Sequence, residues 1–215
     1  MNMEKIKAFA QAVIGDDTTG HDWRHALRVE ANAKKISPPE LSKEDIEIVR
    51  ASCWLHDTID AKIADDKRST IPEVEYSLRE NGATERQIDE VLYIIQNLSY
   101  SKNIDKKQNL SLLGQIVQDA DRLDALGAIG TARAFYYGGS KKHLIYDDTR
   151  PRKAEDITEE NYREQYSVVN HFFEKLLILK DCMNTEKGRE MAEHRTEFMK
   201  QFLDELFDEI KEANN

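Results

Sequence analysis

The spacing of hydrophobic residues along the chain predicts a succession of amphipathic helices. Apolar side chains recur at steps of three and four residues, which is the spacing of one helix face. Helices are expected at residues 6–14, from 21 or 22 to 36, from 42 to 56, between Pro72 and Gly82, and around 88–95. Because no segment shows a convincing strand pattern, the sequence predicts an all-α fold.

The second half of the chain continues this pattern with longer segments. Residues 110–135 are apolar on nearly every face, which predicts one central helix of a bundle. Residues 136–156 contain Gly138-Gly139 and several basic side chains, and we expect a long loop there. Two long helices, from Glu159 to about Met183 and from Glu186 to Ala213, are expected to complete the chain. Since no linker or shift in composition divides it, residues 1–215 are expected to form a single domain.

Composition narrows the range of partners. The chain has 31 Lys and Arg against 41 Asp and Glu, a formal net charge of −10, so its general surface is unsuited to nucleic acid or anionic lipid. An anionic substrate therefore needs a local cationic pocket or a metal ion. Neither a membrane-spanning run nor a signal peptide is evident, which favours a cytoplasmic location. Cys53 and Cys182 lie far apart, so no disulfide framework is expected.

Four ionisable residues stand where the pattern predicts the protein interior. His25, His56 and Asp121 each lie on the apolar face of a separate predicted helix, and Asp57 directly follows His56. Burying four such groups costs several kcal/mol unless they are paired or bound to a cation. One divalent metal ion resolves this cost. Two imidazoles and two carboxylates suit Mn²⁺ or Mg²⁺, with Fe²⁺, Co²⁺ or Ni²⁺ as further choices, and a six-coordinate ion keeps about two positions for water and substrate.

The ordered set of His25, His56-Asp57 and Asp121 resembles the H…HD…D signature of the HD-domain metal-dependent phosphohydrolases. The local sequences at 21–29, 54–57 and 118–123 carry the likeness. Tyr137-Gly138-Gly139 and the segment 174–181 are similar to one bacterial branch of small all-helical proteins, some of which are nucleoside-triphosphate pyrophosphohydrolases. The resemblance implies an HD-domain helical bundle at about residues 20–135 with a loop and additional C-terminal helices at 136–215. It also implies that these four residues ligate one ion.

The resemblance suggests further roles around the ion. A carboxylate four residues after the doublet histidine often orients or deprotonates the attacking water, and here that position is Asp60, which joins Asp57 as a catalytic candidate. Asp124, one helical turn after Asp121, is expected either to hold a ligand imidazole or to cap a backbone group. Phosphate substrates require additional cationic or polar partners. The expected substrate-binding residues are His21, Arg28, Lys62, Arg133, Lys141 and Lys142, with Arg24, Arg122 and Arg150 as further candidates.

Simpler structural roles are expected or open for several residues of the ionisable and aromatic types named so far. Cys53 is expected to be a small buried residue and not a thiolate ligand, and His171 and His194 are expected to be surface or packing residues. Lys141, Lys142 and His143 either contact phosphate or lie in a solvated loop. Tyr136 and Tyr137 either pack against the protein or stack on a base.

The expected function is metal-dependent hydrolysis of a phosphate ester or anhydride in a small molecule, with a nucleotide as the substrate. If the resemblance extends to the substrate, a nucleoside triphosphate is cut into a monophosphate and pyrophosphate. A nucleotide phosphomonoesterase, which releases orthophosphate, is one alternative, and a nucleotide-sensing protein without turnover is another. Oxygen-activating relatives use additional ligands that the sequence does not clearly supply. A homodimer is left open.

Overall fold

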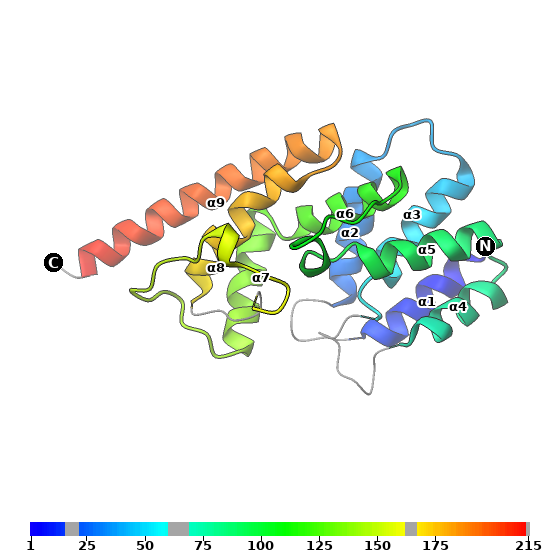
Figure 1. The fold of residues 1–215 in the computed structure, drawn as a ribbon, viewed down its shortest axis with the longest axis horizontal. Coiled ribbons are helices and arrows are strands. Elements are labelled where there is room, and N and C mark those ends of the chain that lie inside the picture. Colours follow the sequence, from blue (N-terminus) through cyan, green and yellow to red (C-terminus); the bar gives the residue numbers. More distant parts are fainter. Residues whose placement is uncertain (16–21, 60–68, 162–166, 214–215) are drawn as a thin grey trace.

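The computed structural model describes residues 1–15, 22–59, 69–161 and 167–213, and helices dominate these segments (Figure 1). The α-helices are α1 (Met3–Ile14), α2 (Trp23–Ile36), α3 (Lys43–Leu55), α4 (Ile71–Glu80), α5 (Glu85–Asn97), α6 (Leu112–Asp124), α7 (Gly127–Ser140), α8 (Val168–Glu174) and α9 (Glu186–Ala213). Three short 3₁₀ helices are η1 (Ser101–Asn103), η2 (Ala154–Asp156) and η3 (Leu176–Cys182). The described residues contain one isolated β-bridge and no strand. The predicted all-α class is therefore confirmed.

Side-chain caps fix where the early helices begin. The Asp22 carboxylate accepts a hydrogen bond from the backbone N–H of His25 at 2.8 Å and caps α2. Ser42 and Asp45 form a reciprocal capping box before α3, in which the Asp45 N–H donates to Ser42 Oγ at 3.1 Å. Such caps satisfy backbone N–H groups that have no partner within the helix. Both starts agree with the sequence prediction.

The prediction of a single helix at residues 110–135 is wrong. The chain forms two helices there, α6 and α7, with a sharp turn between them. Leu126 is extended, with φ −116° and ψ 161°, and Gly127 has φ 71°. A positive φ is strained for residues with a side chain, so glycine permits the turn. As a consequence α7 leaves the end of α6 at a steep angle (Figure 1), and Arg133 in α7 reaches Asp124. The helix also runs on to Ser140, so the loop predicted from residue 136 begins only after it.

The long helix predicted from Glu159 to Met183 is also wrong. Within the described residues, α8 begins at Val168, and Lys175 interrupts the helix with φ −139° and ψ −59° before η3 follows. The buried carboxylate of Glu174 binds Arg152 from the preceding loop, with Nη2 to Oε2 at 2.7 Å. This long-range contact competes with local helix periodicity. By contrast, α9 spans the predicted residues Glu186–Ala213.

The site-bearing helices lie at the centre of the fold. Helix α2 packs against α3 and α6, while α9 runs along one side and its C-terminal half extends away from the body (Figure 1). Val29, Ile48, Trp54, Ile116 and Leu123 are fully buried between these elements. Such close packing fixes the helices relative to one another. None of the helices in the described segments is long and apolar enough to cross a membrane.

Candidate metal centre

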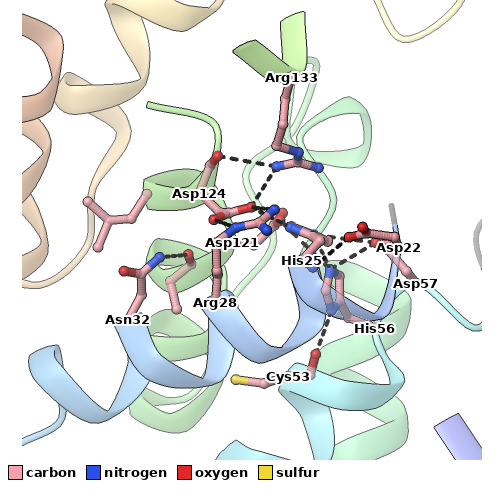
Figure 2. A network of polar contacts seen from close by, with 12 residues as sticks. Asp22, His25, Arg28, Asn32, Cys53, His56, Asp57, Asp121, Asp124 and Arg133 are labelled. Atoms are coloured by element: carbon pink, nitrogen blue, oxygen red, sulfur yellow. Dashed lines mark hydrogen bonds and ion pairs between the residues drawn. The ribbon is translucent and has the colours of Figure 1, made fainter. Parts of the chain in front are cut away.

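The ends of three helices bring the predicted ligands together (Figure 2). His25 lies in the first turn of α2, just after its cap. His56 is the C-terminal cap of α3, and Asp57 is the next residue. Asp121 belongs to the last turn of α6. Residues that are far apart in sequence thus converge because α2 packs between α3 and α6.

The donor atoms of these residues surround one point. The Nε2 atoms of His25 and His56 are 3.3 Å apart. Asp57 Oδ2 lies 3.4 Å from each of them, and Asp121 Oδ1 lies 3.4 Å from His25 Nε2 and 3.7 Å from His56 Nε2. The ligand atoms of His25, His56 and Asp121 all fall within 4.8 Å of one another. Neighbouring ligands of a six-coordinate ion are roughly 3 Å apart when each ligand lies about 2.1 Å from the ion, so the spacing fits a bound cation.

Hydrogen bonds to the other ring nitrogens support this fit. Nδ1 of His25 lies 2.7 Å from the Asp124 carboxylate, and Nδ1 of His56 lies 2.9 Å from the carbonyl of Cys53. Both partners are acceptors, so each Nδ1 carries a proton. A neutral imidazole then presents a lone pair at Nε2. Two lone pairs and two carboxylates facing one point repel each other unless a cation lies between them.

The same electrostatic balance shifts the pKa values. Burial alone lowers the pKa of His25, and Arg133 lowers it further, but the carboxylates of Asp121, Asp124 and Asp57 raise it overall. Burial raises the pKa of Asp121, yet the hydrogen bond with His25 and the nearby His56 hold it well below the usual range. Positive charge at this point is therefore favourable, whether a proton or a metal ion carries it.

Asp124 anchors two arginines as well as His25. Arg28 donates from Nε to Oδ1 at 2.7 Å and from Nη2 to Oδ2 at 3.0 Å. Arg133 donates to Oδ2 at 2.9 Å and to the Asp124 carbonyl at 3.2 Å. Burial raises the pKa of Asp124, but the hydrogen bonds from His25 and Arg28 keep it low, so the carboxylate stays ionised. Sequence spacing identified Asp124 but not its bonds to these arginines.

A second set of contacts, which the sequence analysis missed, fixes the register of the site-bearing helices. Arg195 of α9 donates to Asn32 Oδ1 at 3.0 Å and also to the Leu123 carbonyl. Asn32 in turn donates to the Ala120 carbonyl at 3.2 Å. These bonds tie α2 and α6 together behind the donor atoms. No local signal marks them, because Asn32 and Arg195 are 163 residues apart.

The other predicted residues lie in varied surroundings. Cys53 is fully buried, and its sulfur lies on the side away from His56 (Figure 2). Burial raises the pKa of its thiol well above the usual value, which disfavours a thiolate ligand. Lys141 and Lys142 are exposed beyond the end of α7, and Lys141 Nζ lies 5.7 Å from the Tyr137 ring centroid. Both lysines therefore lie at the protein surface, just after the end of α7.

Further candidates are buried, exposed or outside the described residues. Arg122 is buried and donates to the Cys182 carbonyl. Arg24 and Arg150 are exposed. Three predictions lie outside the described residues: His21, Asp60 and Lys62.

Comparison with known proteins agrees with this geometry. The HD domain family model matches residues 22–126. This range contains all four proposed metal ligands: His25, His56, Asp57 and Asp121. YpgQ of Bacillus subtilis (strain 168) is 40% identical over 208 residues, covering 96% of this chain and 93% of YpgQ. The chain belongs to the HD-domain family. The H…HD…D residues identified from sequence therefore lie in the HD region.

Solved structures of similar proteins share the fold over nearly the whole chain. A Lactobacillus plantarum protein superposes with a TM-score of 0.85 at 37% identity, covering 97% of this chain and 96% of that protein. B. subtilis YpgQ in complex with ADP gives a TM-score of 0.77 at 38% identity, with 97% and 94% covered. An HD-superfamily hydrolase from Bacillus thuringiensis gives 0.72 at 37% identity, with 97% and 96% covered.

Proposed function

We propose that this protein is a divalent-metal-dependent phosphohydrolase that acts on nucleotides. The observation that carries the proposal is the facing pair of imidazole Nε2 atoms, 3.3 Å apart, with two carboxylates at the same point. The HD-superfamily hydrolase from B. thuringiensis supports hydrolysis, and the ADP complex of YpgQ supports a nucleotide ligand. Our specific proposal is cleavage of a nucleoside triphosphate into a monophosphate and pyrophosphate.

His25, His56, Asp57 and Asp121 would hold Mn²⁺ or Mg²⁺ in this proposal. When bound, such an ion lowers the pKa of a ligated water and offsets negative charge on the phosphate. Asp124 keeps the His25 ring oriented through the 2.7 Å hydrogen bond to Nδ1. Asp121 has a side chain that is 31% exposed, which leaves the donor set open on that side. Asp60 is proposed to orient or deprotonate the attacking water.

Arg28 and Arg133 are proposed to receive phosphate oxygens. Two guanidinium groups share the carboxylate of Asp124, and the Asp22 carboxylate also acts on Arg28, so the two arginines supply hydrogen-bond donors close to the donor set. The side chain of Arg28 is 33% exposed, and that of Arg133 is 18% exposed. A guanidinium carries five donors in a fixed plane, so one edge can bind Asp124 while another meets an incoming oxygen. His21, Lys62, Lys141 and Lys142 are the further substrate contacts in this proposal.

A product assay tests the proposal directly. Protein freed of metal with a chelator is incubated with a panel of nucleoside mono-, di- and triphosphates, with and without Mn²⁺, and pyrophosphate and orthophosphate are measured separately. Pyrophosphate that appears only with Mn²⁺ is the expected result. Orthophosphate alone would favour the phosphomonoesterase. Nucleotide binding without any product would favour a sensor and overturn the hydrolase.

Matched variants assign the product to the site. Asp57→Ala removes a proposed ligand and is expected to abolish Mn²⁺-dependent release. Asp181→Ala makes the same substitution at a carboxylate that is 68% exposed on η3 and is expected to leave release unchanged. Full activity in Asp57→Ala would contradict the assignment of the metal site.

A further inference from the structure

One side of α7 is exposed to solvent and yet carries almost no polar side chain. Charged residues make up 33% of the whole chain, but Arg133 is the one charged residue among the 14 residues of α7. Solvent-facing sides of helices usually carry charged and polar residues. The exposed positions of α7 are instead Ala128, Ile129, Ala132, Tyr136, Gly139 and Ser140. An exposed apolar surface of this kind is typical of a place where a ligand or another molecule binds.

Two large side chains dominate this side of the helix. Ile129 is 48% exposed and Tyr136 is 56% exposed. They are seven residues apart, which is about two helical turns, so they lie on the same side of α7. Ala132 lies between them and is also exposed. Because alanine carries only a methyl group, a flat ring can lie close to the helix there. We call Ile129, Ala132 and Tyr136 the α7 face.

The neighbouring Tyr137 lies in a different environment. It is half-buried, and Lys141 Nζ lies 5.7 Å from its ring centroid. An ammonium group at that distance already occupies one face of the aromatic ring. Of the two adjacent tyrosines, Tyr136 is therefore the one that is suited to stack on a ligand.

Arg133 connects the α7 face to the metal centre. Its guanidinium donates to Asp124 Oδ2 at 2.9 Å, and the same oxygen lies 2.7 Å from Nδ1 of His25 (Figure 2). Ile129 precedes Arg133 by four residues and Tyr136 follows it by three, so both are its neighbours on the helix surface. Side chains lean toward the N-terminus of their helix, which directs Tyr136 over the turn that carries Arg133. The α7 face thus begins beside a proposed phosphate contact.

The chemistry of the α7 face suits the base of a nucleotide. An apolar surface with an aromatic ring, next to a guanidinium group, matches a molecule that has a flat ring at one end and phosphates at the other. The π face of an aromatic side chain stacks on any nucleobase, because stacking does not depend on the hydrogen-bonding groups that differ between bases. Binding sites for small molecules commonly combine such an apolar wall with a few polar groups.

We propose that the α7 face binds the base of the substrate, with Tyr136 stacked on the base and Ile129 and Ala132 in contact with its edge. This inference rests on the proposed nucleotide substrate and adds the residues that select the base. Since Ile129 and Ala132 offer no hydrogen-bonding side chains, the face distinguishes bases by ring size. Purine nucleotides are expected to bind more tightly than pyrimidine nucleotides, with little difference between adenine and guanine.

Binding measurements with and without a base test the α7 face. Isothermal titration calorimetry with Mn²⁺ compares a non-hydrolysable purine nucleoside triphosphate analogue with inorganic tripolyphosphate, which has the phosphates but no base. Tyr136→Ala is expected to weaken binding of the analogue by about tenfold and to leave the affinity for tripolyphosphate within about twofold of the wild type. Wild-type protein that binds both ligands equally tightly would overturn the proposal, and so would wild-type protein that does not bind the analogue.

Two further variants separate stacking from other effects. Tyr136→Phe keeps the aromatic ring and is expected to retain the affinity for the analogue within about twofold. Tyr76→Ala removes the same type of side chain from α4, where it is 67% exposed, and is expected to leave both affinities unchanged. Circular dichroism and thermal unfolding check that each variant is folded. Equal weakening by Tyr136→Ala and Tyr76→Ala would contradict a specific role for the α7 face.

Steady-state kinetics give a second, independent readout. The ratio of kcat/KM for purine over pyrimidine nucleoside triphosphates is expected to fall in Tyr136→Ala. The change should appear in KM with little change in kcat, because the base lies away from the reacting phosphate. An unchanged ratio would show that Tyr136 does not select the base.

The outcomes for the α7 face and for the hydrolase are separable. If no nucleotide is hydrolysed but the analogue binds through Tyr136, the hydrolase proposal fails and the α7 face stands. If hydrolysis proceeds and Tyr136→Ala binds the analogue like the wild type, the α7 face fails and the hydrolase stands. Sedimentation velocity covers a further outcome: a changed oligomeric state in Tyr136→Ala with unaltered affinity would assign the face to a second copy of the chain and overturn the proposal.

Discussion

Of the three aspartates in α6, Asp119 and Asp121 are two residues apart and lie in opposite electrostatic situations. Residues at this spacing point about 200° apart around a helix. Asp119 is fully buried at the junction with α9, whereas Asp121 faces the imidazoles of His25 and His56. Both lie on a helix of the core, so location in the core does not separate them. The difference lies in what each carboxylate meets.

Asp119 meets hydrogen-bond donors only. Its Oδ1 accepts from the backbone and side-chain N–H groups of Asn184, both at 2.9 Å. Its Oδ2 accepts from the backbone N–H of Thr185 at 2.7 Å and from the Thr185 hydroxyl at 2.8 Å. These donors precede the first turn of α9, where negative charge is favourable. A carboxylate so fully satisfied holds two helices together and needs no ion.

Asp121 meets groups that are themselves acceptors on the side facing it. His25 and His56 have their protons engaged at Nδ1 by Asp124 and the Cys53 carbonyl. A surplus of acceptors around one point, and not burial of charge alone, therefore marks the candidate metal centre. The predictions below test whether these two regions can be disrupted independently.

The largest effect is expected for Asp121→Asn. Replacing one carboxylate oxygen by an amide nitrogen removes an anionic ligand, and Mn²⁺ affinity is expected to fall by at least about 100-fold. Wild-type protein should gain about 2.7 kcal/mol of stability at a Mn²⁺ concentration 100 times its Kd, whereas the variant should gain little. Calorimetric titration and thermal unfolding with and without Mn²⁺ measure both quantities. Unaltered Mn²⁺ affinity would contradict the assignment.

Asp119→Asn is expected to have the complementary effect. The amide cannot replace the charge that accepts the bonds from Asn184 and Thr185, and breaking a buried charged network costs about 3 kcal/mol of the free energy of unfolding. Urea denaturation measures the loss. At urea concentrations below the unfolding transition, the Mn²⁺ affinity of the variant is expected to match that of the wild type. Loss of Mn²⁺ binding at full stability would show that the two regions are not separable.

Asp124→Asn sharpens the comparison within the centre itself. The amide loses the charge that orients His25 and neutralises Arg28, and Mn²⁺ affinity is expected to fall by about 10- to 100-fold. Calorimetric titration with Mn²⁺ gives the change. Asp22→Asn is the control, since asparagine caps a helix about as well as aspartate, and it should stay within about threefold. Equal changes in the two variants would rule out a specific role for Asp124.

The smallest effect is expected for Gly188→Ala, which crowds the junction without removing a hydrogen bond. An added Cβ would lie 2.6 Å from Thr185 Oγ1 and 2.7 Å from Asp119 Oδ2. The expected loss is about 1–2 kcal/mol of unfolding free energy, measured by urea denaturation. A Cβ added at Gly139 in α7 would have no heavy atom within 4 Å. Gly139→Ala should therefore stabilise the protein by up to about 1 kcal/mol, because alanine favours a helix more than glycine does. A neutral Gly188→Ala would indicate that the junction tolerates movement.

Much of the fold and the candidate site could be predicted from local sequence. Apolar periodicity located α1 to α5 and α9, and capping residues such as Asp22 and Ser42 marked helix starts. The same periodicity placed His25, His56 and Asp121 on interior faces. Predictions failed where a distant contact or a special backbone angle opposed the local pattern, as at the turn before Gly127 and at Lys175 after α8.

The sequence by itself placed His25, His56 and Asp121 on inward helix faces, because a helix face depends only on residues three or four positions apart. The tertiary structure decided what those residues meet. Asp119 is bound by Asn184, 65 residues away, while Asp124 is bound by Arg28, 96 residues away. Such partners come together only when the helices pack. The tertiary structure is therefore needed to distinguish Asp119, which joins two helices, from Asp121, which faces two imidazole rings.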